Sequence, residues 1–191
     1  MTTDPGLILA LEALATEAAA STARLVADRV GGDLGAATKS SATDVVTEVD
    51  TAAEHHLVEL LLGARPDDAV MGEEGADHAG TSGVRWILDP IDGTTNFVYG
   101  HPGYAVSVAA ELHGTVVAGA VADVARAELF AASAGNGARL DGRPISATHA
   151  ADLALALVAT GFGYDPERRR RQAEVLTRLL PRVRDIRRMG S

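Results

Sequence analysis

The sequence contains no cysteine, a single tryptophan and few aromatic residues of any kind. Without cysteine, disulfides, thiolate catalysis and zinc–thiolate sites are all excluded. No stretch approaches 18 uninterrupted apolar residues, the length that would predict a membrane span. The N-terminal segment MTTDPG has no positive residue leading into an apolar run and does not resemble a secretory signal. We therefore expect a cytoplasmic protein with no membrane-spanning segment.

Positive charge is scarce over most of the chain and is concentrated near its end. The net charge is −9, yet the segment from Arg168 to Ser191 holds nine arginines against only Glu174 and Asp185. Lysine and arginine contacts to phosphates supply nearly all non-specific nucleic-acid affinity, so the acidic chain as a whole disfavours nucleic-acid binding. The basic segment Arg168–Arg188 could instead meet an acidic protein partner, although a solvated helix face is the simpler interpretation of Arg168–Arg171.

Length and patterning predict an α/β protein in two parts. A chain of 191 residues suits one domain, or one and part of a second. Capping residues and apolar periodicity predict helices from Pro5 to about Gly31, from Thr43 or Asp44 to Gly63, and from Pro166 to about Leu180. Strands are predicted at 69–71, 84–88, 104–112, 115–121, 128–132, 138–145 and 185–188, and at 153–160, where the apolar run favours a strand buried on both faces. We expect an N-terminal α+β domain at 1–146, and the start of an incomplete α/β domain at 147–191.

Acidic residues gather at the ends of two of these strands. The segment Gly72–Glu74 places two carboxylates after one strand, and Asp89–Asp92, with the sequence Asp-Pro-Ile-Asp, follows another. Because proline cannot donate to a strand ladder, we expect the chain to leave the sheet at Pro90. A turn there would aim both aspartates and the Ile91 carbonyl at one spot.

Electrostatics indicate what such a cluster is for. Two carboxylates about 4 Å apart repel by about 4 kcal/mol at an effective dielectric constant near 20, and a third adds more. Mg²⁺ removes this repulsion, because it is a hard cation held by carboxylate, carbonyl and water oxygens. The lack of a nearby histidine pair or of cysteine argues against zinc. The sequence therefore predicts a magnesium site.

The motif LDPIDGTTNF at 88–97 resembles the metal-binding signature of the inositol monophosphatase family, a branch of the lithium-sensitive, Mg²⁺-dependent phosphatases. The resemblance covers nearly the whole chain and continues through KSSATDVVTEVD at 39–50, GEE at 72–74, YAVSV at 104–108, GAVADVA at 119–125, GARLDGRPIS at 137–146 and ATGFGYD at 159–165. It implies a layered α-β-α-β-α sandwich of the sugar-phosphatase type, here truncated at its C-terminus, and a homodimer when full length.

The resemblance also implies the metal ligands. Glu73, Asp89 and the carbonyl of Ile91 would hold a first Mg²⁺, which lowers the pKa of the attacking water, so that Glu73 is also a catalytic residue. Asp89 and Asp92 would hold a second Mg²⁺ at the leaving alkoxide oxygen, with Asp92 facing the substrate. Attack would be in line, without a covalent enzyme intermediate.

The remaining implied roles belong to residues around the ligands. Thr94 and Asp50 would orient and deprotonate the attacking water as a general-base relay. Gly93 and Thr94 would offer backbone N–H groups to the phosphate. Lys39 would lie near the mouth of the site, and Glu74 would lie behind the ligands.

The chain departs from the family pattern at its end. The family takes a further ligand for the second metal from a downstream Trp-Asp pair, whereas Trp86 is the only tryptophan here and the sequence stops at RRMGS. We therefore expect a fragment or a truncated gene product that, alone, binds the second Mg²⁺ poorly and has little activity.

The resemblance implies hydrolysis of myo-inositol monophosphate, or of a similar small polyol phosphate, to the alcohol and phosphate. Two alternatives stay open. One is a histidinol-phosphate or sugar-bisphosphate phosphatase of the same superfamily. The other is a non-enzymatic regulatory partner of the transcription machinery, which the truncation and the basic segment favour.

Overall fold

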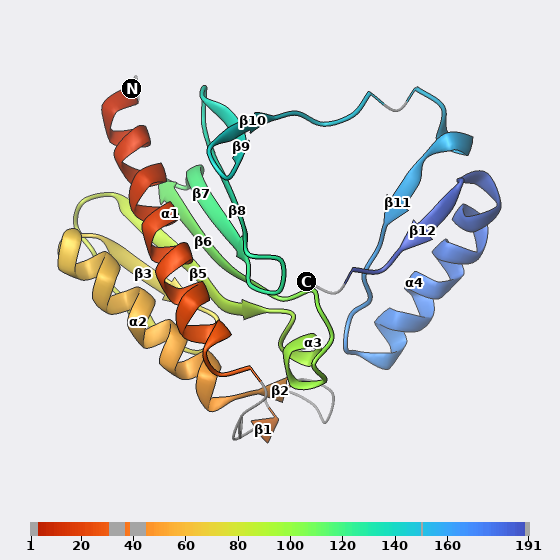
Figure 1. Cartoon of the computed structure of the whole chain (residues 1–191), viewed down its shortest axis with the longest axis horizontal. Coiled ribbons are helices and arrows are strands. Elements are labelled where there is room, and N and C mark those ends of the chain that lie inside the picture. The colour runs from red at the N-terminus through yellow and green to blue at the C-terminus, as the bar shows by residue number, and fades with distance from the viewer. Residues whose placement is uncertain (1–3, 31–36, 39–44, 150, 190–191) are drawn as a thin grey trace.

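The computed structural model describes residues 4–30, 37–38, 45–149 and 151–189. Two long helices cover one face of a large sheet, and a smaller unit of two strands and a helix lies on the other side (Figure 1). The arrangement is the layered α/β sandwich expected from the sequence.

The large sheet positions the residues of interest. In the described part of the chain it has the strand order β10-β9-β8-β7-β6-β5-β3-β4. The bounds are Ala69–Gly72 for β3, Asp77–His78 for β4, Val84–Asp92 for β5, Ala105–Leu112 for β6, Thr115–Asp123 for β7, Glu128–Ser133 for β8, Gly137–Leu140 for β9 and Arg143–Ile145 for β10. Neighbouring strands run antiparallel except β3 and β5, which run parallel. The last residues of β3 and β5 therefore reach the same edge of the sheet.

Helix α1 (Pro5–Ala27) begins where the sequence predicts. Asp4 caps it by accepting a hydrogen bond from the Gly6 amide, and Pro5 occupies the first turn, where no N–H partner is needed. By length and composition alone α1 is apolar enough to cross a membrane. In the structure its apolar face packs on β6, β7 and β8 and forms part of the core.

Helix α2 (Glu48–Ala64) starts later than the predicted Thr43 or Asp44, which lie outside the described residues. Its start is fixed by a capping box, in which the Thr47 side chain and Asp50 satisfy each other's backbone amides. The two residues before this box, Val45–Val46, form the short strand β2, which pairs with β1 (Ala37–Thr38). The helix packs on α1 and β5 (Figure 1).

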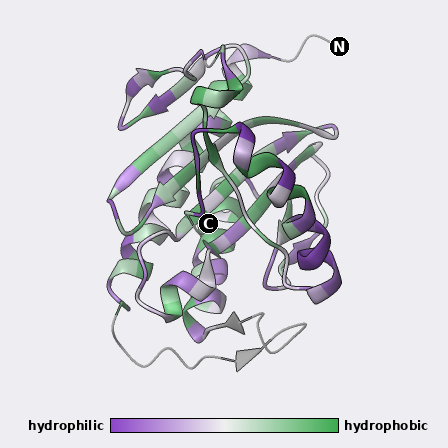
Figure 2. Ribbon diagram, turned by 90° about the vertical axis from the view of Figure 1, so that its right-hand side faces the viewer, coloured by the Kyte–Doolittle hydropathy of each residue, from purple (hydrophilic) through white to green (hydrophobic). Residues whose placement is uncertain are grey.

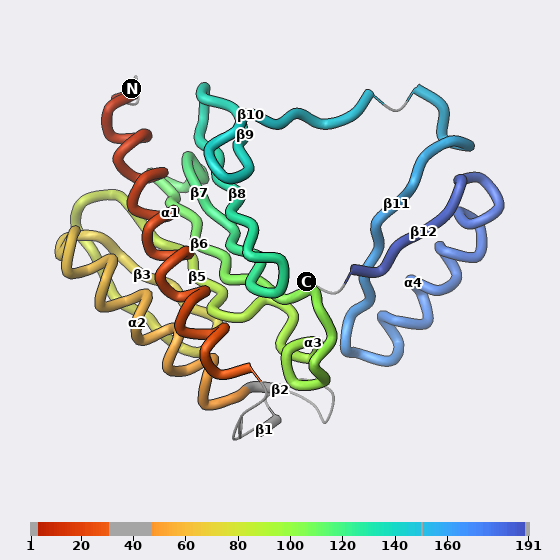
Figure 3. Tube along the Cα trace, viewed as in Figure 1, coloured from red at the N-terminus to blue at the C-terminus, as the bar shows by residue number. Residues whose placement is uncertain are grey.

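The C-terminal unit is a β-α-β motif. Strands β11 (Leu157–Ala159) and β12 (Asp185–Arg187) are parallel, and α4 (Pro166–Leu179) lies between them in sequence. Two 3-10 turns, η1 (Leu153–Leu155) and η2 (Leu180–Arg182), precede β11 and follow α4. Figure 3 shows an extended connection leaving β10 toward this unit, but the proposed division into domains at 146 stays a prediction.

The prediction of a strand at 153–160 buried on both faces is wrong. Within this segment only Leu157–Ala159 forms a strand, and Leu155 and Leu157 are 60% and 59% exposed. The apolar run predicts a strand buried on both faces, but in the described chain β11 belongs to a two-stranded sheet with β12, and the Leu157 and Ala159 side chains are exposed. Figure 2, which views the molecule from the side of α4, shows that helix as largely hydrophilic.

Candidate active site

Glu73 and Asp89 become neighbours because β3 and β5 are parallel. Gly72, the last residue of β3, pairs with Leu88, and the amide of Glu73 donates to the Leu88 carbonyl at 3.1 Å. The next residue along each strand is therefore a carboxylate at the same sheet edge. Glu73 directly follows β3 and Asp89 lies within β5, so the pairing of these two strands brings the two residues to the same end of the sheet.

Asp92 reaches the same edge through a β-bulge. Asp89 pairs with Ser107 and Asp92 pairs with Ala105, so three steps along β5 oppose two steps along β6. The extra residue lets β5 continue to Asp92, and the expectation that the chain leaves the sheet at Pro90 is wrong. A bulge accommodates the missing proline N–H and changes the direction of the side chains that follow. Both aspartates are half-buried.

Thr94 connects this edge to α2. Gly93 has a φ of 93°, a left-handed conformation that ends β5 and starts the short helix α3 (Thr94–Val98). The Thr94 hydroxyl then lies 3.0 Å from the Ile91 carbonyl oxygen and 3.3 Å from Asp50 Oδ1. Two sequence-predicted residues that are 44 positions apart are thus in contact.

Asp50 is completely buried and held in place by its own helix start. Its Oδ2 accepts from the Thr47 amide at 2.8 Å and from the Thr47 hydroxyl at 2.5 Å. This leaves Oδ1 directed at Thr94. The Asp50 carboxylate therefore caps α2 and also accepts a hydrogen bond from the Thr94 hydroxyl, which lies beside the Ile91 carbonyl.

The chemistry of these donors fits Mg²⁺. Three carboxylates and a backbone carbonyl are hard oxygen ligands, and no histidine or cysteine stands among them. Within the described residues, no group of three or more His, Cys, Asp or Glu side chains could hold a metal ion as they stand. Carboxylates repel one another at short range, and a cation placed among them would remove that repulsion.

An aromatic pair supports α3 beside the site. The rings of Phe97 and Tyr104 meet edge to face, with centroids 5.2 Å apart. Burial, and secondarily the negative charge of Asp123, raise the pKa of Tyr104 above its ordinary value of 10.0. The Asn96 side chain donates to the Gly103 carbonyl at 2.7 Å and so ties α3 to the start of β6.

Not every predicted residue can be placed, and one was missed. Lys39 lies outside the described residues. Glu54 was not predicted, although its buried carboxylate accepts hydrogen bonds from the amides of Glu74 and Ala76. The signal available was its position four residues after Asp50, on the same face of α2.

The sequence profile of the inositol monophosphatase family matches residues 9–191. The inositol-1-monophosphatase of Mycobacterium leprae is 48% identical over 195 residues, which cover 94% of this chain and 67% of that protein. The Nus factor SuhB of Pasteurella multocida is 37% identical over 156 residues, covering 81% of this chain and 58% of that protein. Among solved structures, the extragenic suppressor protein suhB of Bartonella henselae has a TM-score of 0.89 and 34% identity, covering 95% of this chain and 71% of that one.

Proposed function

The chain belongs to the inositol monophosphatase family, and from that premise we propose that it is a Mg²⁺-dependent phosphatase of myo-inositol monophosphate or a similar small polyol phosphate. The observation that carries the proposal is the contact between Asp50 and Thr94, formed beside the Ile91 carbonyl and next to the strand ends that bear Glu73 and Asp89. A purely structural helix cap would not need to reach the acidic edge of the sheet, by which we mean the end of the sheet that bears Glu73, Asp89 and Asp92.

The proposed ligands divide between two Mg²⁺ ions. Glu73, Asp89 and the Ile91 carbonyl would hold the first, and Asp89 and Asp92 would hold the second. The bound metal supplies a lowered pKa for the attacking water and charge neutralisation for the phosphate. The acids alone would repel a phosphate ester, so this cation is also what allows the substrate to approach.

The proton of the attacking water goes to the Asp50–Thr94 pair. Thr94 donates toward Asp50 Oδ1 or the Ile91 carbonyl, so its oxygen lone pairs are open to accept a hydrogen bond from water. Asp50 is buried and its other oxygen is occupied by Thr47, so a proton taken up by Asp50 resides on the oxygen that faces Thr94. Asp50 thereby acts as the general base, with Thr94 as the group that orients the water.

The rest of the proposed site surrounds this pair. The backbone N–H groups of Gly93 and Thr94 bind phosphate oxygens, and Glu74 supports the ligands from behind. We also propose a cytoplasmic enzyme that is a homodimer as the whole gene product.

The test measures phosphate release from myo-inositol monophosphate by the whole gene product, with Mg²⁺ varied and Li⁺ added as a competitor. Turnover should require Mg²⁺ and fall with Li⁺. A parallel panel with histidinol phosphate and a sugar bisphosphate separates the rival substrates. Absence of Mg²⁺-dependent phosphate release from the whole panel would refute the proposal.

Two substitutions separate metal binding from proton transfer. Asp92→Asn removes a ligand and relieves repulsion, so turnover should be abolished with little loss of stability. Asp50→Asn should retain Mg²⁺ binding while turnover falls about 10²- to 10⁴-fold, the usual contribution of a general base. Asp77→Asn, an equal loss of charge at an exposed position of the same sheet, is the control and should change neither quantity. Most of the activity surviving in Asp92→Asn would show that the metal assignment is wrong.

A second candidate function comes from the relatives named Nus factor SuhB. Here the chain would act as a regulatory partner of the transcription machinery through the basic segment Arg168–Arg188. In its favour, none of the residues of α4, all of them described, is buried, and its arginines are exposed to a partner. This role does not require phosphate release, so the phosphatase assay distinguishes the two.

A further inference from the structure

Glu54 is a buried acid that the proposed chemistry does not use. It is 3% exposed and lies on α2 one helical turn after Asp50. Its Oε2 accepts from the Glu74 amide at 2.8 Å, and its Oε1 accepts from the Ala76 amide at 2.8 Å. Both oxygens are acceptors from backbone groups 20 or more residues away, which makes Glu54 a clamp on the turn that follows β3.

The turn at 72–76 is built around this carboxylate. The Gly72 amide donates to the Ala76 carbonyl at 2.7 Å and closes the turn. A Cβ on Gly72 would lie 2.0 Å from Glu54 Oε2 and 2.5 Å from its Cδ. Gly72 is an ordinary strand residue with no left-handed backbone. Glycine is needed at this position because the Glu54 side chain occupies the space that a larger residue would fill.

Glu73 lies inside the clamped turn. Its backbone is fixed on one side by the hydrogen bond from its amide to Leu88 in β5. On the other side, its neighbour Glu74 is fixed by Glu54. The direction in which Glu73 leaves the sheet therefore depends on the Glu54 carboxylate. Among the described residues, this carboxylate contacts the backbone of the turn and not the side chains of the proposed metal ligands.

We propose that Glu54 is a positioning residue for Glu73. By holding the Glu74 and Ala76 amides it fixes the turn in the conformation that presents Glu73 beside Asp89, and so sets the affinity for the first Mg²⁺. The inference rests on the proposed function only in taking Glu73 as a metal ligand. Groups that hold metal ligands in place typically change metal affinity by about 10- to 100-fold when they are removed.

The experiment compares Glu54→Gln and Glu54→Ala with the unaltered 191-residue chain. In Glu54→Gln one oxygen becomes an NH₂ group that faces a backbone N–H, so one anchor is lost, whereas in Glu54→Ala both are lost. Calorimetric titration with Mg²⁺ alone should give about 10-fold weaker binding for the glutamine variant and up to about 100-fold weaker binding for the alanine variant. Hydrogen exchange at the Glu74 and Ala76 amides should become at least about 10-fold faster, while the amides of the later turns of α2 keep their protection.

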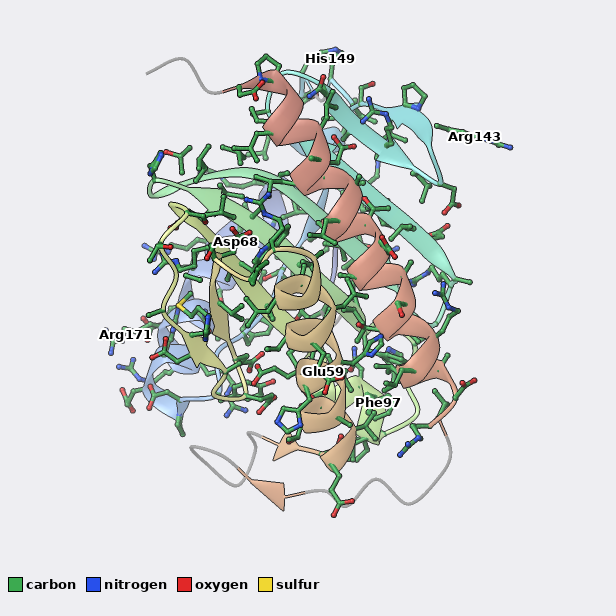
Figure 4. The ribbon with its side chains drawn as sticks, turned by 90° about the vertical axis from the view of Figure 1, so that its left-hand side faces the viewer. Glu59, Asp68, Phe97, Arg143, His149 and Arg171 are labelled. Carbon is green, nitrogen blue, oxygen red and sulfur yellow. The ribbon has the colours of Figure 1, made fainter. Side chains whose placement is uncertain are left out.

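The matched control is Glu59→Gln, on an exposed position of the same helix (Figure 4). It should change neither Mg²⁺ affinity nor exchange at the turn. Unchanged Mg²⁺ affinity in Glu54→Gln, with the unaltered chain binding, would overturn the inference. Failure of the unaltered chain to bind Mg²⁺ would count against the proposed metal site, and the exchange rates at Glu74 and Ala76 would still decide whether Glu54 holds the turn.

A second pair of variants tests the clamp without depending on the Glu54 substitutions alone. Gly72→Ala should weaken Mg²⁺ binding, because its Cβ displaces the Glu54 carboxylate. In the Glu54→Ala background the same substitution should have a much smaller further effect, since the Glu54 carboxylate is gone and the closest remaining contact of the new Cβ is the Ala76 Cβ at 3.0 Å. Such non-additivity is expected only for residues that act through one contact. Equal effects of Gly72→Ala in both backgrounds would contradict the proposal.

Discussion

A buried cluster around Asp68 fixes the start of the two strands that carry the site. Asp68 precedes β3, is 1% exposed and lies at the end of the sheet opposite the acidic edge (Figure 4). Its Oδ2 accepts from the indole N–H of Trp86 in β5 at 2.9 Å and from Arg65 Nε at 2.5 Å. Its Oδ1 accepts from the Ser82 hydroxyl at 2.6 Å. The carboxylate thereby joins the residue before β3 to β5 at the start of their parallel pairing.

Removing this carboxylate should be costly, because Trp86 cannot reach water. Trp86 is fully buried, so Asp68→Ala leaves its N–H without an acceptor at about 1–3 kcal/mol. Arg65 is 30% exposed, so solvent screens the loss of its ion pair and adds only about 1 kcal/mol. The total is about 3 kcal/mol, or a fall in Tm of about 6–12 °C for a chain of this size. Asp68→Asn keeps the shape and one acceptor and should cost about half as much.

The assay follows urea unfolding by the emission of Trp86, the only tryptophan, and by circular dichroism. Emission reports directly on the clustered side chains, and circular dichroism reports on the sheet as a whole. Asp67→Ala is the matched control, because that side chain is exposed and only its backbone carbonyl bonds with Thr81 and Ser82. A loss below about 1 kcal/mol for Asp68→Ala, or one no larger than that of the control, would refute this reasoning.

Two further predictions concern pH and charge. Burial and Asp123 raise the pKa of Tyr104, so the folded chain holds the phenolic proton more tightly than the unfolded chain does. The contribution of this group to the free energy of unfolding is therefore present below pH 10.0 and is lost as the pH rises above it. Tyr104→Phe keeps the contact with Phe97 and should remove this part of the loss of stability at alkaline pH. Urea unfolding at pH 8 and at pH 10.5 would measure the loss in both proteins. Identical losses in the variant and the unaltered chain would contradict the assignment. Reversing Arg168–Arg171 to glutamate should abolish retention of an acidic partner in pull-downs while leaving Mg²⁺ affinity unchanged, and an unaltered set of partners would count against the regulatory role.

The acidic edge could be anticipated from the sequence because each acid directly follows, along the chain, the apolar residues that predict its strand. Glu73 and Asp89 each follow a short apolar run. When two parallel strands are neighbours in a sheet, as β3 and β5 are, the residues that follow such runs lie at the same end of the sheet. The start of α1 was equally local, since Asp4 and Pro5 determine it by themselves. The strands predicted at 104–112 and 115–121 leave only His113 and Gly114 to connect β6 with β7, and both residues have positive φ values, 50° and 83°.

Features that depend on distant parts of the chain could not be read in this way. Pro90 predicts the end of a strand by its own chemistry, but the pairing of Asp92 with β6 holds β5 in the sheet through a bulge. The segment 153–160 is apolar enough for a core strand, yet burial depends on what packs against its two faces, and Leu157 and Ala159 are exposed. The sequence alone gives Glu54 the pattern of an ordinary helix acid. Its role depends on hydrogen bonds from the turn at 72–76, which is distant in sequence.

The spacing of Asp50 and Glu54 on α2 makes this helix intolerant of changes in length. The carboxylate that meets Thr94 and the carboxylate that holds the 72–76 turn lie four positions apart, a rise of about 6 Å along the axis. One residue inserted between them would rotate Glu54 by about 100° around the helix and point it away from β3. The same insertion after Leu61 would leave both carboxylates in register, so insertions and deletions should be far rarer between the two acids than in the last turn of the helix.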